Sequence, residues 1–131
     1  MKIEQMDVGL VSATGALADF YADVLGLARL EPRQFPFATV HRLACGPVTL
    51  KVMVPADPPE TPATPDRFWD RVGFRYLTLW VDDLGSLADR WSAGGGTVAM
   101  APTEIRPGVE SALLVDPDGN VVEAMRQAAG A

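Results

Sequence analysis

The sequence predicts an α+β fold of two tandem modules, each with the element order β-α-β-β-β. The main observation is an internal repeat: Gly15-Ala16-Leu17-Ala18-Asp19 recurs as Gly85-Ser86-Leu87-Ala88-Asp89, 70 residues later. Each copy follows a β-like run and opens a segment with the apolar spacing of an amphipathic helix. Three further strand-like stretches follow each helix, so both halves show the same design.

In the first module, we expect the first strand at Met6–Val11. The helix follows because apolar residues from Leu17 to Leu25 recur at i, i+3, i+4, i+7 and i+8, which forms one stripe. Ser12 or Thr14 can cap its start, and Gly26 can supply the left-handed residue that ends it. The next strands are separated by Phe35-Pro36-Phe37 and Cys45-Gly46-Pro47, and their expected bounds are Ala28–Phe35, Ala38–Ala44 and Val48–Val54.

In the second module, the first strand is expected at Arg75–Val81. A matching helix stripe is formed by Leu84, Leu87, Ala88 and Trp91, with Asp82 or Asp83 as the cap and Gly94-Gly95-Gly96 as the stop. The remaining strands are expected at Thr97–Ile105, Ser111–Val115 and Asn120–Met125. Between the last two, Asp116-Pro117-Asp118-Gly119 predicts a tight hairpin turn, because proline presets φ and glycine accepts a positive φ.

The segment between the two halves is rich in proline, with Pro55, Pro58, Pro59, Pro62 and Pro65. Such a composition favours an extended connection. We therefore expect module one at residues 1–55, a linker at 56–72 and module two at 73–131.

Alternation along the strands assigns side chains to faces. In the second module, Leu77, Leu79 and Val81 suit the helix side, which leaves the other residues of that strand on the opposite, concave side. An apolar wall with a few convergent polar groups is the usual composition of a small-ligand site. The same parity on the first and last strands of both modules predicts a ligand-binding wall of Asp7, Thr49, Lys51, Met53, Tyr76, Thr78, Trp80, Glu123 and Met125.

Composition narrows the class of partner. The 131 residues include 17 acidic and 11 basic side chains, a net charge of −6, which argues against nucleic-acid binding and favours a cationic or amphipathic guest. Cys45 is the only cysteine, which excludes a disulfide framework and a multi-thiolate metal site. Uncharged stretches are too short for a spanning helix and Met1-Lys2-Ile3-Glu4 is not a signal peptide, so we expect a cytoplasmic domain with no membrane partner.

The pattern resembles the vicinal oxygen chelate superfamily, which groups glyoxalases, bleomycin-resistance proteins, extradiol dioxygenases and methylmalonyl-CoA epimerase. The resemblance covers essentially the whole chain. It implies that the two modules form curved, mostly antiparallel sheets around a cleft, that the cleft lies within one chain or is shared by two, and that the protein is a homodimer. The segments that carry it are Val8–Val11, Phe20–Leu27, Val81–Asp83 and Asp116–Glu123.

Enzymes of that superfamily hold a divalent metal with one ligand from the first and last strand of each module. Carried over by position, those ligands fall on Asp7, Lys51, Tyr76 and Glu123; the spacing to the first helix leaves Gln5 or Met6 as alternatives to Asp7. A protonated lysine has no lone pair to offer, and the set contains no imidazole. We therefore expect no metal and no cofactor. Our hypothesis is that the Lys51 ammonium takes the place of the metal between the carboxylates of Asp7 and Glu123, near the Tyr76 hydroxyl.

Two function classes follow from the resemblance. The first is a metal-free protein that holds a small organic molecule, cationic or aromatic and antibiotic-like, in its cleft. The second is an enzyme of the same superfamily: an isomerase, lyase or dioxygenase that uses Lys51 and Glu123 as acid and base, or a degenerate metal site at Glu123 and Asp7. In the first class the ion cluster only fixes the site geometry, and Tyr76 and Trp80 either stack on a planar ligand or fill the cleft.

Three further residues could have a function although they are not part of the predicted wall. Phe68 and Trp69 precede the second module and predict either a lid or a dimer contact, of which we expect the dimer contact. His41 is the only histidine and is expected to be an ordinary strand side chain, on a face that parity does not settle.

Overall fold

The computed structural model describes residues 1–63 and 67–128. Part of the predicted linker, including Pro65, and the last three residues of predicted module two therefore lie outside the described residues. The chain divides into two compact units, Met1–Pro62 and Ala63–Ala131, and each is described by itself. The predicted α+β fold with two β-α-β-β-β modules is confirmed, since each unit contains one α-helix and one four-stranded mixed sheet in its described part.

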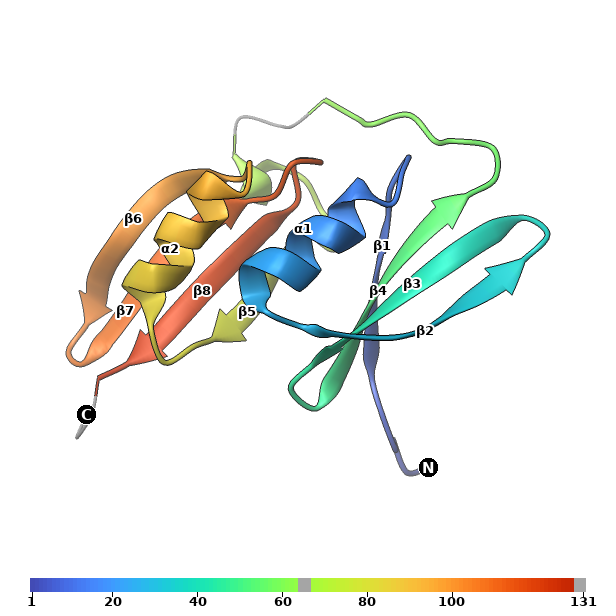
Figure 1. Ribbon diagram of the computed structural model, residues 1–131. Coiled ribbons are helices and arrows are strands. Elements are labelled where there is room, and N and C mark those ends of the chain that lie inside the picture. Colours follow the sequence, from blue (N-terminus) through green and yellow to red (C-terminus); the bar gives the residue numbers. More distant parts are fainter. Residues whose placement is uncertain (64–66, 129–131) are drawn as a thin grey trace. The chain divides into compact units, whose positions relative to one another are not determined.

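The first unit contains β1 (Asp7–Val11), α1 (Ala16–Leu25), β2 (Ala28–Phe35), β3 (Ala38–Cys45) and β4 (Val48–Pro55) (Figure 1). The strand order is β1-β4-β3-β2, with β1 parallel to β4 and the other pairs antiparallel. The ends of these strands differ from the expected ones by at most one residue.

Helix α1 packs its apolar stripe on β3 and β4. Leu17 and Tyr21 of α1, and Leu43 and Val52 of the sheet, are 2% exposed or less, so they form the centre of this core. The helix begins differently from the expectation: its N-cap is Gly15, which has no side-chain cap, and Thr14 instead accepts a hydrogen bond from the Ala16 amide at 3.2 Å.

The end of α1 confirms the role expected for Gly26. This residue has φ 64° and ψ 38°, the left-handed conformation, and its backbone N–H donates to the Ala22 carbonyl. Glycine adopts that conformation without the steric cost that a Cβ imposes. The chain thereby turns directly from the helix into β2.

The second unit contains a short 3₁₀ helix η1 (Phe68–Asp70), then β5 (Tyr76–Trp80), α2 (Leu84–Ala93), β6 (Thr97–Arg106), β7 (Val109–Val115) and β8 (Val121–Gln127) (Figure 1). Its strand order, β5-β8-β7-β6, repeats that of the first unit, again with the outer pair β5 and β8 parallel. Strand β7 begins two residues earlier than expected because Gly108, at φ 77°, turns the chain sharply after β6.

Helix α2 is fixed at its start by Asp83, whose carboxylate accepts a hydrogen bond from the Ser86 amide at 3.0 Å. Asp83 is therefore the cap, and Asp82 is not. On the buried side of the helix, Trp91 is fully buried and its indole N–H donates to the Val115 carbonyl at 2.9 Å. That bond ties the helix to the end of β7 while the ring fills the core.

The predicted hairpin turn between β7 and β8 is confirmed and is organised by one carboxylate. Asp116 is only 3% exposed. Its Oδ1 accepts hydrogen bonds from the amides of Asp118 and Asn120, both at 2.9 Å, and its Oδ2 accepts one from Asn120 Nδ2 at 2.8 Å. Gly119 has φ 93°, the positive-φ corner that the turn requires. These contacts fix the residue at which β8 starts.

The two helices, α1 and α2, have ten residues each. Among the described residues, no helix has the length and apolar character needed to cross a membrane.

Candidate functional site

Each sheet has one face covered by its helix, and we call the opposite face the helix-free face. The structure places all nine predicted wall residues on the helix-free faces of the two sheets. In the first unit these are Asp7 of β1 and Thr49, Lys51 and Met53 of β4. In the second unit they are Tyr76, Thr78 and Trp80 of β5 and Glu123 and Met125 of β8.

The strand register shows that the two units are equivalent at these positions. Asp7 pairs with Thr49, two residues before Lys51. In the same way, Tyr76 pairs with Val121, two residues before Glu123. Asp7 and Tyr76 therefore hold equivalent places, as do Lys51 and Glu123; Gln5 and Met6, the alternatives to Asp7, precede β1.

In the first unit, the structure brings Lys51 and Asp7 together. Lys51 Nζ lies 3.1 Å from Asp7 Oδ2, and Gln5 Nε2 donates to Asp7 Oδ1 at 2.6 Å. The hydrogen bond from Gln5, then the hydrogen bond and charge of Lys51, hold the pKa of Asp7 below its usual value, and the charge of Arg42 acts in the same direction. Because both side chains are partly exposed, the ion pair fixes geometry more than it adds stability.

In the second unit, Glu123 is held by a neighbouring hydroxyl. Thr78 Oγ1 donates to Glu123 Oε1 at 2.9 Å across the parallel pair of β5 and β8. Tyr76 and Trp80 stand on either side of Thr78 along β5 and remain 54% and 57% exposed. Met125 is 4% exposed, so its sulfur is largely inaccessible to a ligand. The second unit thus presents two accessible rings beside a carboxylate.

The short helix η1 adds an aromatic group that strand parity did not predict. The ring centroid of Phe68 lies 5.2 Å from that of Tyr76 and 5.0 Å from that of Trp69, both in edge-on arrangements. Trp69 is 61% exposed and lies under the guanidinium of Arg67, 5.7 Å from its ring centroid. The signal in the sequence was the adjacent Phe68-Trp69 pair close before β5. The dimer contact expected for Phe68 and Trp69 stays a prediction.

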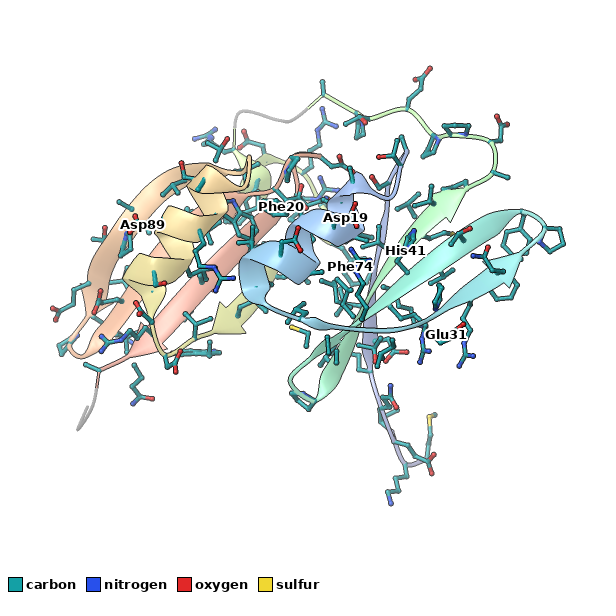
Figure 2. All side chains as sticks on the ribbon, viewed as in Figure 1. Asp19, Phe20, Glu31, His41, Phe74 and Asp89 are labelled. Carbon is teal, nitrogen blue, oxygen red and sulfur yellow. The ribbon has the colours of Figure 1, made fainter. Side chains whose placement is uncertain are left out.

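His41 and Cys45 do not join the helix-free face of the first unit. His41 of β3, labelled in Figure 2, pairs with Val52 on the helix side, and a Cβ added at Gly15 would lie 3.4 Å from its Nε2. This settles the face that parity left open. Cys45 ends β3, and burial raises the pKa of its thiol, which disfavours the reactive thiolate.

The side chains at the four ligand positions do not fit a resident divalent metal. The Asp7 carboxylate already holds an ammonium, and the Glu123 carboxylate is accompanied on β5 by hydroxyl groups. The set contains no imidazole and no thiolate, and the protonated Lys51 amine has no lone pair to offer, so it is a weak set for zinc, nickel or iron. Among the described residues, no three His, Cys, Asp or Glu side chains are grouped so that they could hold a metal ion.

Comparison with known proteins gives one family match and many similar folds. A model of the Glyoxalase/Bleomycin resistance protein/Dioxygenase superfamily matches residues 10–124. A glyoxalase family protein from Bacillus cereus superposes with a TM-score of 0.80 at 12% identity, covering 98% of this chain and 97% of that one. A glyoxalase family protein from Enterococcus faecalis gives 0.69 at 21% identity, covering 95% and 96%. At these identities the likeness shows the fold.

Glyoxalase I from Zea mays superposes with a TM-score of 0.75 at 20% identity. The match covers 95% of this chain but 44% of the maize chain, so this chain spans less than half of that protein. Comparison with curated proteins gives no significant match.

Proposed function

This chain belongs to the Glyoxalase/Bleomycin resistance protein/Dioxygenase superfamily, and on that premise we propose that it binds a small organic molecule directly, without a resident divalent metal. The observation that carries the proposal is the ion pair of Lys51 and Asp7 at 3.1 Å. It lies where the resemblance to the superfamily places two of the metal ligands. A fixed ammonium there supplies positive charge without a bound ion, and it repels a divalent cation that approaches the same carboxylate.

The second unit supports a planar ligand. Tyr76 and Trp80 leave more than half of their surface exposed on the helix-free face. Aromatic rings in such positions gain about 25 cal/mol for each Å² of apolar area that a ligand covers, and offset or edge-on stacking adds to this gain. The Glu123 carboxylate between β5 and β7 can accept a hydrogen bond that orients the ligand.

A thermal-shift screen tests the proposal. The chain is freed of metal with a chelator and melted with a panel of small aromatic compounds of different charge. A ligand present at a hundred times its dissociation constant adds about 2.7 kcal/mol of stability. We expect members of the panel to raise the melting temperature equally with and without chelator.

Two variants separate site binding from general stabilisation. In Trp80→Ala the ligand-induced shift should be lost, whereas Phe37→Ala removes another exposed ring, 63% exposed in the β2–β3 turn, and should leave the shift intact. The proposal is wrong if the shift needs a divalent metal, or if the chain consumes a compound catalytically instead of retaining it.

A further inference from the structure

The helix-free face of the first unit concentrates positive charge. One cation comes from each of three neighbouring strands: Lys51 of β4, Arg42 of β3 and Arg33 of β2. Lys51 and Arg42 are direct cross-strand partners. Of the residues that the register assigns to this face, only Asp7 is acidic.

The place of Arg33 depends on an irregularity in β2. Leu30 pairs with Arg42 and Arg33 pairs with Val40, so the register shifts between Leu30 and Arg33. Residues three apart in a regular strand face opposite sides, but an extra residue in the strand returns Arg33 to the side of Arg42. The strand irregularity therefore completes a diagonal row of three cations, in which Arg33 lies opposite Val40, two residues along β3 from Arg42.

The positive charge of this row is only partly neutralised. Asp7 pairs with Lys51. Arg42 donates to the carbonyl oxygen of Glu31 at 3.1 Å, which occupies one of its N–H groups but leaves its charge uncompensated. Within the described residues, neither Arg42 nor Arg33 forms an ion pair with a carboxylate. Because like charges directly opposite on neighbouring strands repel, Lys51 and Arg42 would both gain from an anion placed between them.

From this arrangement we infer that the helix-free face of the first unit recognises an anionic oxygen group, a carboxylate or a phosphate, of a small organic ligand. The inference rests on the proposed function and specifies its ligand class. A guanidinium presents N–H donors in a planar fork that matches both groups, and such charge-assisted bonds are the strong ones. Met53, which lies on the same face and is partly exposed, offers apolar surface to the organic part.

The net charge of the chain favours a cationic ligand, but only at a distance. A charge of −6 attracts cations through the solvent. At physiological ionic strength that attraction is screened beyond about 8 Å. A ligand in contact with this face therefore responds to the nearby cations, and the local charge determines the preference.

Three probes with one ring system and different charge test the inference: 1-naphthoate, 1-naphthyl phosphate and 1-naphthylmethylamine. Dissociation constants are measured by calorimetry on the full chain, and backbone amide shifts around Lys51 and Arg42 locate the bound probe. We expect at least one of the two anions to bind more tightly than the amine. The comparison of the two anions distinguishes a carboxylate from a phosphate as the preferred group.

A matched pair of variants assigns the effect to this face. Arg42→Gln should weaken binding of the preferred anion by about tenfold, as expected for a lost charge-assisted hydrogen bond. Arg33→Gln should also weaken it. Arg29→Gln makes the same charge change on the helix side, where Arg29 pairs with Asp19 of α1; Asp19 is labelled in Figure 2. This control should change the affinity by less than about twofold, as for a distant exposed charge. Circular dichroism melts confirm that the variants fold.

The other outcomes distinguish failure of the inference from failure of the proposed function. If the amine binds as tightly as the anions, or if Arg29→Gln weakens binding as much as Arg42→Gln, the inference is wrong while the proposed function stands. The same holds if neither anion binds but another compound of the thermal-shift panel does. If no compound of any charge binds, the proposed function is wrong and the inference falls with it.

Discussion

Replacement of Asp116 tests how one buried carboxylate sets the strand that carries Glu123. Asp116 accepts two backbone hydrogen bonds through Oδ1 and one side-chain bond through Oδ2. In Asp116→Ala all three of these hydrogen bonds are lost. Hydrogen bonds to a charged group contribute about 1.5 kcal/mol each at the low end, so the two backbone bonds alone give about 3 kcal/mol. Asp116→Asn keeps one oxygen for the backbone amides and should cost about 1 kcal/mol.

The assay is urea unfolding at neutral pH, followed by tryptophan fluorescence, with the free energy of unfolding compared between variants. Asp57→Ala provides the control, because it removes the same charge from an exposed residue and should change stability by less than about 0.5 kcal/mol. The Asp116 carboxylate does not have this role if Asp116→Ala costs no more stability than Asp57→Ala, or if the alanine and asparagine variants at 116 are equally destabilised.

Three further predictions concern single residues. Lys51→Met should raise the pKa of Asp7 in an NMR titration, because the ammonium is lost, while Gln5 still holds the pKa below its usual value; an unchanged pKa would contradict the pairing. Because the folded pKa is lowered, the Asp7 contacts stabilise the fold above the unfolded pKa, and this contribution is lost as pH falls through the folded value. Trp91→Phe should lower the free energy of unfolding in urea by about 1–2 kcal/mol, since the indole hydrogen bond is lost and the core is less filled; no loss would show that this bond contributes little. Gly26→Ala should cost about 1 kcal/mol in the same assay from its positive φ alone, because an added Cβ meets nothing within 4 Å, and a neutral result would contradict the role assigned to this helix end.

Much of the fold could be predicted because the sequence repeats its own pattern. The two helices have a regular 3.6-residue spacing, and the strands alternate with period two, so the order of elements and most of their ends followed from local signals. The faces of β5 and β8 followed in the same way, which is why Tyr76, Trp80 and Glu123 were placed correctly on the side opposite the helix.

Other features depend on contacts that local spacing does not reveal. The helix η1 has three residues, too few to show a period, so the packing of Phe68 on Tyr76 could not be predicted. The shift of register between Leu30 and Arg33 changes which side chains share a face, so alternation alone would have misplaced Arg33. Adjacent candidates such as Asp82 and Asp83 are distinguished only by which carboxylate reaches the Ser86 amide.

In the function proposed for this chain, side chains recognise the organic ligand and no bound metal takes part. Equilibrium dialysis of the full chain against zinc, nickel, manganese and ferrous ions, followed by elemental analysis, tests it most directly. We expect far less than one metal per chain for each ion, and the same small amount in Glu123→Gln. One metal per chain, lost in Glu123→Gln, would contradict it.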